Sequence, residues 1–123
     1  MQLDQKARTR ILIVEDEPVI ALSLEELLVD AGFKIAGIAG KLDKALALIA
    51  SGACDAAIVD ANLAGVSAAP IASALKARGH PFIVLSGYSS DQLQGDFPGT
   101  FFIQKPVRFA QLIAAVNTIL VEQ

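Results

Sequence analysis

The sequence has one cysteine, no long apolar run and no excess of basic residues, and each shortage excludes a class of protein. The single cysteine, Cys54, cannot form a disulfide within the chain, which favours the reducing cytoplasm. No apolar run approaches the roughly 20 residues of a membrane-spanning helix, and residues 1–8 lack the apolar centre of a signal peptide. A net charge of −3 provides no basic footprint for nucleic acid. We therefore expect a cytoplasmic protein with no membrane span and no direct contact with nucleic acid.

Hydrophobic residues, in contrast, are abundant and make up 54% of the 123 residues. A chain of this length is the usual size of one domain with a single core. No internal repeat or low-complexity stretch divides it. We predict a polar N-terminal tail at 1–9 and one domain at 10–123.

Short apolar runs alternate with longer stretches of helical periodicity, which is typical of repeated βα units. The runs predict strands at 10–14, 34–38, 55–60, 82–86 and 100–104, and the stretches predict helices at 18–31, 41–51, 66–78 and 107–121. We expect a doubly wound α/β fold, a five-stranded parallel sheet in the flavodoxin-like order 2-1-3-4-5 with right-handed crossovers. In the helices at 18–31 and 107–121, the residues predicted to pack on the sheet are Ile20, Leu24, Leu27, Leu28, Ala31, Phe109, Leu112, Ile113, Val116 and Leu120.

Acidic residues follow two of the predicted strands. Glu15 and Asp16 come directly after the run at 11–14, and Asp60 comes directly after the run at 56–59. In a doubly wound sheet, ligands bind beyond the carboxyl ends of the strands, where the strand order reverses. Carboxylates that meet there repel one another unless a cation lies between them. Mg²⁺ is the natural cation for such a site of oxygen ligands.

A hydroxyl and an ammonium group follow two further strands. Ser86 comes after the run at 81–85, and Lys105 comes after the run at 100–104. With the carboxylates they would supply a nucleophilic aspartate, metal ligands, a hydroxyl donor and a fixed cation. Phosphoryl transfer needs positioning and charge neutralisation of this kind. Taken alone, Ser86 is interpreted more simply as a turn residue and Lys105 as a solvated side chain.

These elements, in this order, resemble the receiver domain of bacterial two-component response regulators. The resemblance covers nearly the whole chain, from about Arg10 to Val121. The motifs that carry it are Glu15-Asp16, Asp60, Ser86 and Lys105-Pro106. It implies a (βα)₅ receiver fold of the flavodoxin-like kind.

A narrower similarity is to the receiver subgroup with a Phe-x-x-x-Ser/Thr-Gly-Tyr fourth strand, often found beside HWE-type histidine kinases. The stretch from Phe82 through Ser86-Gly87-Tyr88 is a variant of that pattern. Ala64 stands where the more widespread receivers carry proline, four residues after the acceptor, which also favours the subgroup.

The resemblance implies a role for each residue of the acidic crevice. Asp60 is implied to accept a phosphoryl group from a phosphohistidine. Mg²⁺ is implied to bind Asp16, Asp60 and the backbone carbonyl of Asn62, with Glu15 reaching it through water. Lys105 is implied to pair with Asp60 and then with a phosphoryl oxygen.

Further residues are assigned to switching by the same resemblance. Ser86 would donate a hydrogen bond to the phosphoryl group, and Phe102 stands at the position of the switch aromatic, although a strand phenylalanine is usually core. Tyr88 would flank the acceptor, as would the Asn62 side chain. Gly87 would serve backbone geometry, and Pro106 would form a cis peptide bond with Lys105.

The implied function is a phospho-accepting switch with no enzymatic activity beyond its own phosphorylation and dephosphorylation. The phosphoryl group would come from a sensor histidine kinase or a histidine phosphotransfer protein, and the switch would change binding to a downstream protein. The alternative is a receiver-like interaction module that works without phosphorylation, which the intact acidic pair, Asp60 and Lys105 argue against. A phosphatase of the haloacid dehalogenase kind needs a second aspartate where Asn62 stands, and a flavodoxin needs a phosphate-binding loop after the first strand.

The segment from Tyr88 to Pro98 has few apolar residues that could hold it against the core. A short helix is predicted to begin at Ser89, where a serine three residues before Gln92 is typical of a capped start. Because little buried area would hold the segment, we expect it to fluctuate and to become ordered on phosphorylation.

Overall fold

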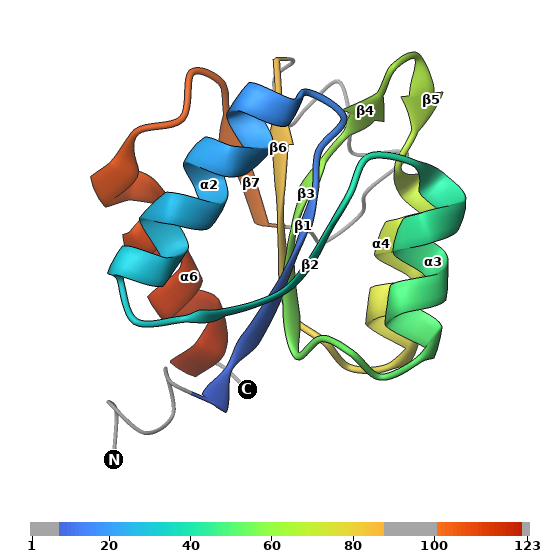
Figure 1. The fold of residues 1–123 in the computed structure, drawn as a ribbon, viewed down its shortest axis with the longest axis horizontal. Coiled ribbons are helices and arrows are strands. Elements are labelled where there is room, and N and C mark those ends of the chain that lie inside the picture. The colour runs from blue at the N-terminus through green and yellow to red at the C-terminus, as the bar shows by residue number, and fades with distance from the viewer. Residues whose placement is uncertain (1–7, 88–100, 122–123) are drawn as a thin grey trace.

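A five-stranded parallel sheet forms the centre of the protein in the computed structural model, which describes residues 8–87 and 101–121. Its strands are β1 (Arg10–Val14), β2 (Lys34–Ala39), β3 (Ala56–Asp60), β6 (Phe82–Ser86) and β7 (Phe101–Gln104). Their spatial order is β2-β1-β3-β6-β7 (Figure 1). Numbered along the chain, this is the predicted order 2-1-3-4-5, so the predicted fold class is confirmed. The order reverses between β1 and β3, which pair directly.

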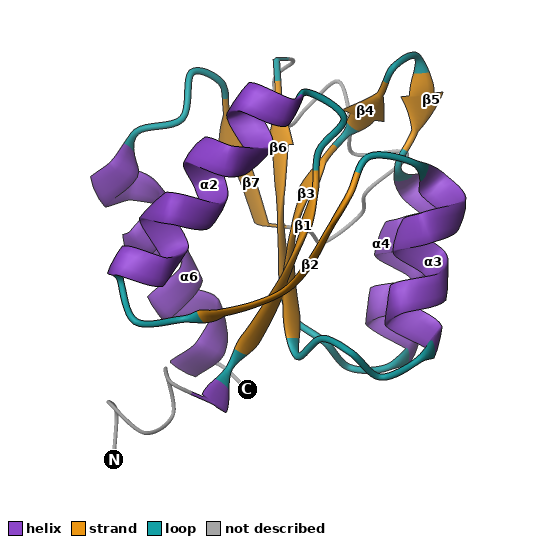
Figure 2. Cartoon of the chain, viewed as in Figure 1, coloured by secondary structure: helices purple, strands orange, loops and turns teal. Residues whose placement is uncertain are grey.

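Helices cover both faces of the sheet (Figure 2). Helices α2 (Pro18–Asp30) and α6 (Phe109–Val121) lie on one face, and α3 (Leu42–Ala50) and α4 (Ala69–Ala77) lie on the other. Among the described residues, no helix is long and apolar enough to cross a membrane. The helix predicted to begin at Ser89 lies outside the described residues.

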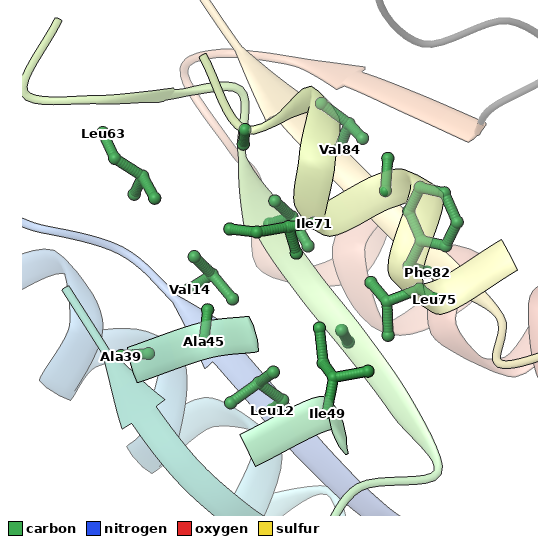
Figure 3. Close-up of a cluster of buried hydrophobic side chains, with 14 of the residues drawn as sticks. Leu12, Val14, Ala39, Ala45, Ile49, Leu63, Ile71, Leu75, Phe82 and Val84 are labelled. Carbon is green, nitrogen blue, oxygen red and sulfur yellow. The ribbon is translucent and has the colours of Figure 1, made fainter. Parts of the chain in front are cut away.

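The core consists of two buried clusters, one on each side of the sheet. Successive residues of a strand point to opposite faces, so Leu12 and Val14 join one cluster while Ile11 and Ile13 join the other. Figure 3 shows the cluster under α3 and α4, where Ile49 and Ile71 approach the strands. Because both faces of the central strands are covered, β3 and β6 are buried at every position, as their nearly continuous hydrophobicity predicts. Cys54 is buried in the same cluster.

The predicted helix at 66–78 is wrong at its start. A short antiparallel hairpin, β4 (Asn62–Leu63) and β5 (Val66–Ser67), comes first, and α4 begins only at Ala69. The turn residues Ala64 and Gly65 both have positive φ, 51° and 91°, which an α-helix does not allow. The remaining predicted boundaries of helices and strands within the described residues differ from the structure by at most two residues.

Two residues predicted to pack on the sheet are instead exposed. Ile20 is 38% exposed, because α2 buries Ala21, Leu24 and Leu28 on the adjacent stripe of the helix. Phe109 is 67% exposed, because it is the first residue of α6 and precedes the turn that packs on the sheet. The spacing of apolar residues in α2 fits both stripes, so periodicity alone did not distinguish them.

Candidate functional site

The residues predicted for the site lie at the carboxyl edge of the sheet. Asp60 is the last residue of β3 and Ser86 the last of β6, while Glu15 and Lys105 directly follow β1 and β7. Backbone hydrogen bonds extend the parallel pairing past the strand ends: the Glu15 N–H donates to Ala39 O at 3.0 Å, and the Lys105 N–H donates to Ser86 O at 2.7 Å. The side chains therefore project from a fixed sheet edge.

Asp60, Ser86 and Lys105 line an open pocket of about 330 Å³. Its walls come from the loops after β1, β3, β6 and β7 and from the first turn of α2. The lining residues are Asp16, Glu17, Ile20, Asp60, Ala61, Asn62, Ala64, Ser86, Gly87 and Lys105. The pocket thus lies at the reversal of strand order, where a doubly wound sheet binds its ligands.

Three carboxylates converge beside this pocket. One oxygen each of Glu15, Asp16 and Asp60 lies within 4.8 Å of the others. Glu15 and Asp60 are only 2% and 6% exposed, whereas Asp16 is half-buried. Negative charges this close in a poorly solvated place repel one another strongly. The arrangement needs positive charge to balance it.

Lys105 supplies one such charge. Its Nζ donates a hydrogen bond to Asp60 Oδ2 at 2.9 Å and lies 4.0 Å from Glu15 Oε1. Partial burial lowers the pKa of Lys105, but the hydrogen bond to Asp60 and the nearby carboxylate charges outweigh it, so the pKa is raised. The ammonium group therefore stays charged, as a fixed cation at the acceptor.

Glu15 has one carboxylate oxygen that is buried without a hydrogen-bond partner. Its Oε2 accepts a hydrogen bond from the Glu17 N–H at 3.1 Å, but its buried Oε1 has no hydrogen-bond partner. Burial, and then the charge of Asp60, raise the pKa of Glu15 to about 7 against the hydrogen bond from Glu17 and the charge of Lys105. An orphaned buried oxygen among carboxylates fits a hard divalent cation such as Mg²⁺, which prefers oxygen ligands.

The remaining predicted site residues are placed as follows. The N–H of Asn62 donates to Asp60 Oδ1 at 3.1 Å, so Asn62 is adjacent to the acceptor. Ser86 is 3% exposed at the pocket wall beside Gly87. The Lys105–Pro106 peptide bond is cis, as the resemblance implied.

Phe102 is not among the residues that line the pocket. Phe102 is half-buried and packs against the core cluster on the α3 and α4 side of the sheet, opposite Val84 of β6. Tyr88 and the segment predicted to switch, 88–98, lie outside the described residues. The switch role of both residues stays a prediction.

Sequence reasoning missed four residues that line the pocket: Glu17, Ile20, Ala61 and Ala64. Glu17 follows the acidic pair and could have been found from that position. Ile20 was assigned to the core because its spacing fits a buried stripe, and the side chains of Ala61 and Ala64 have no chemistry that marks a site. These residues help to define the shape of the pocket.

The comparison with protein families identifies the class of protein that this fold and site define. The model of the response regulator receiver domain matches residues 11–117, and the chain belongs to this family. Receiver domains are, in general, non-enzymatic signalling modules of two-component systems. They bind Mg²⁺ in an acidic pocket.

Two curated relatives are similar over most of this chain. The phyllosphere-induced regulator PhyR of Methylorubrum extorquens is 32% identical over 116 residues, which is 91% of this chain and 43% of PhyR. The transcriptional regulatory protein PdtaR of Mycobacterium tuberculosis is 30% identical over 118 residues, 93% of this chain and 58% of PdtaR. The chain thus spans about half the length of these relatives.

Solved structures give the same result for the fold. SdrG from Sphingomonas melonis is 39% identical with a TM-score of 0.79, and the match covers 93% of this chain and 98% of SdrG. The receiver domain of PhyR from Erythrobacter litoralis is 30% identical with a TM-score of 0.83, over 94% of this chain and 92% of that domain.

Proposed function

We propose that this protein is a phospho-accepting switch that takes a phosphoryl group onto Asp60 in the presence of Mg²⁺ and thereby changes its binding to a partner. The observation that carries the proposal is the contact of Asp60 with Lys105 inside the cluster of carboxylates. A phosphorylation-independent interaction module has no need to hold three carboxylates and a lysine together at a cost in repulsion.

The proposed reaction is a displacement at phosphorus. A carboxylate oxygen of Asp60 attacks the phosphorus of a phosphohistidine, the P–N bond breaks, and the imidazole leaves with the electron pair of that bond. The product is an aspartyl phosphate. The protein catalyses only its own phosphorylation by this transfer and its own later dephosphorylation by hydrolysis.

The chain's own residues position the acceptor before the reaction. The Asn62 N–H holds Asp60 Oδ1, while the Lys105 ammonium holds Asp60 Oδ2 and is ready to pair with an incoming phosphoryl oxygen. Ser86, at the pocket wall, would donate a hydrogen bond to another phosphoryl oxygen. Positioning and charge neutralisation of this kind account for most of the catalysis in phosphoryl transfer.

The proposed Mg²⁺ ligands are Asp16, Asp60 and the backbone carbonyl of Asn62, with Glu15 acting through water. The ion would supply the positive charge that the carboxylate cluster lacks and would neutralise phosphoryl oxygens.

The proposed phosphoryl donor is a histidine kinase or a histidine phosphotransfer protein, and the proposed output is a downstream protein. An HWE-type kinase is the donor that the variant fourth-strand pattern favours. A location in the cytoplasm, expected from the single cysteine, stays a prediction.

Intact mass after incubation with Mg²⁺ and acetyl phosphate tests the proposed function. We expect a gain of one phosphoryl group in the wild-type protein and none in Asp60→Asn. Omission of Mg²⁺ should prevent the gain. A wild-type protein that gains nothing from acetyl phosphate or from a phosphorylated histidine kinase would support the interaction module instead.

A further inference from the structure

The acceptor strand is followed by a tight hairpin. In it Asn62 pairs with Ser67, and Leu63 pairs with Val66. The two residues between the paired strands, Ala64 and Gly65, both have positive φ. This conformation at both central positions is that of a type I′ turn, for which asparagine, aspartate and glycine are the preferred residues.

Alanine is an unfavourable residue at the first turn position. Its Cβ opposes the left-handed conformation, and its side chain has no polar atom to hydrogen-bond the backbone locally. The turn must therefore be held by residues around it. Leu63 is buried at 3% exposure and fixes one strand, while the Ala68 N–H donates to Ala61 O at 3.0 Å and closes the base.

The tip of the hairpin is held by the Asn62 side chain. Its Oδ1 accepts a short hydrogen bond, 2.7 Å long, from the Gly65 N–H. At the same time, the backbone N–H of Asn62 donates to Asp60 Oδ1 at 3.1 Å. One residue thus bonds the acceptor with its backbone and the turn with its side chain.

We propose that Asn62 is a positioning residue: its side chain fixes the 62–65 turn and so holds its own backbone against Asp60 and toward the Mg²⁺ site. This inference rests on the proposed function and differs from a role of the Asn62 side chain beside the acceptor, because Oδ1 is engaged with Gly65. The hydrogen bond between Asn62 Oδ1 and the Gly65 N–H stabilises the turn against the unfavourable left-handed conformation of Ala64.

Magnesium affinity and amide exchange together test the proposal. Truncation in Asn62→Ala should weaken Mg²⁺ binding roughly tenfold, the effect of losing a group that orients a metal ligand, and should speed hydrogen exchange of the Gly65 amide several-fold. Asn62→Asp keeps an Oδ1 acceptor, so in metal-free protein the Gly65 amide should stay as protected as in the wild type. Binding is followed by calorimetric titration and exchange by nuclear magnetic resonance.

Ser67→Ala is the matched control in the same hairpin. It removes the hydrogen bond from the Ala69 N–H to Ser67 Oγ, 3.2 Å long, and leaves the Asn62 turn intact. Its Mg²⁺ affinity should equal that of the wild type. The proposal is overturned if Asn62→Ala binds Mg²⁺ as tightly as the wild type, if Ser67→Ala loses as much affinity, or if Asn62→Asp exposes the Gly65 amide. A wild-type protein that binds no Mg²⁺ would instead overturn the metal site of the proposed function, and this inference with it.

Discussion

Lys105 Nζ lies 2.9 Å from Asp60 Oδ2, although the two residues are 45 positions apart and their strands do not pair. Strand β6 lies between β3 and β7, so the contact spans three strands at the carboxyl edge of the sheet. Such a contact requires that β3, β6 and β7 pair in the correct register. In the proposed function it is also the contact that an arriving phosphoryl group would rearrange, because the ammonium would then pair with a phosphoryl oxygen.

Removal of the Lys105 cation should impair the switch more than the fold. In Lys105→Ala we expect Mg²⁺ binding to persist and stability to fall by about 1.5–3 kcal/mol, the scale of one hydrogen bond to a charged group. The conformational response to beryllium fluoride, a phosphoryl mimic, should be lost, because nothing pairs with the added charge. Amide spectra with and without the mimic measure this response, and Lys34→Ala, at an exposed lysine of β2, is the control. A full response in Lys105→Ala would exclude the cation from the switch.

Mg²⁺ should stabilise the folded protein through Asp16. Because the cation binds the folded carboxylate cluster and not the unfolded chain, it should raise the melting temperature as its concentration rises. Asp16→Asn should abolish most of that rise and leave the fold intact. Asp30→Asn, at the exposed end of α2, should respond to Mg²⁺ like the wild type. Thermal unfolding at a series of Mg²⁺ concentrations measures this rise in melting temperature. If the rise is undiminished in Asp16→Asn, Asp16 is not a ligand of the ion.

The raised pKa of Glu15 predicts how metal-free stability depends on pH. Burial raises this pKa from 4.5 to about 7, so the folded state binds the proton more tightly than the unfolded chain does. The stabilisation that comes from the proton on folded Glu15 is therefore fully present below about pH 4.5, and it is lost as the pH rises toward 7. Glu15→Gln should be more stable than the wild type at pH 7 to 8, with a flatter profile over this window, whereas the exposed Glu26→Gln should follow the wild type.

Urea unfolding of metal-free protein at a series of pH values measures these profiles. Equal slopes for Glu15→Gln and the wild type between pH 4.5 and 7 would contradict the assignment. Mg²⁺ should have the opposite pH dependence, because it favours the ionised carboxylate and so binds more weakly as the pH falls below 7.

Ala64→Gly should stabilise the protein. Alanine in the left-handed region costs roughly 1–2 kcal/mol, and glycine removes that cost while it adds some entropy to the unfolded chain. We expect a net gain of about 0.5–1 kcal/mol in the free energy of unfolding. The same substitution in a helix, Ala114→Gly in α6, should lower stability by about 1 kcal/mol. Urea unfolding measures both, and a loss of stability in Ala64→Gly would contradict the role assigned to its backbone conformation.

The order of the strands and the convergence of the site were predictable because both follow from strong local signals. Continuous β-branched runs mark strands buried on both faces, and polar residues directly after them must meet at one sheet edge. Asp60, Glu15, Asp16, Ser86 and Lys105 could therefore be assembled from their positions alone, and the structure brings them together.

The hairpin at 62–67 and the exposure of two apolar residues were not predictable in this way. Ala64 carries no turn signal, so its left-handed backbone depends on the Asn62 contact and on the anchoring of Leu63, which local propensity does not encode. Ile20 and Ala21 both fit helical stripes of α2, and only packing against the sheet selects Ala21. The lack of a hydrogen-bond partner at Glu15 Oε1 likewise depends on how the loops after β1, β3 and β7 meet.

The measurement that tests the central claim most directly is the location of the phosphoryl group after transfer from a phosphorylated histidine kinase or phosphotransfer protein. Borohydride reduces an aspartyl phosphate to homoserine, so peptide mapping after reduction identifies the residue that carried it. We expect homoserine at position 60, dependent on Mg²⁺ and absent from Asp60→Asn. Homoserine at Asp16 or another carboxylate, or none from any phosphohistidine donor, would contradict the assignment of Asp60 as the acceptor.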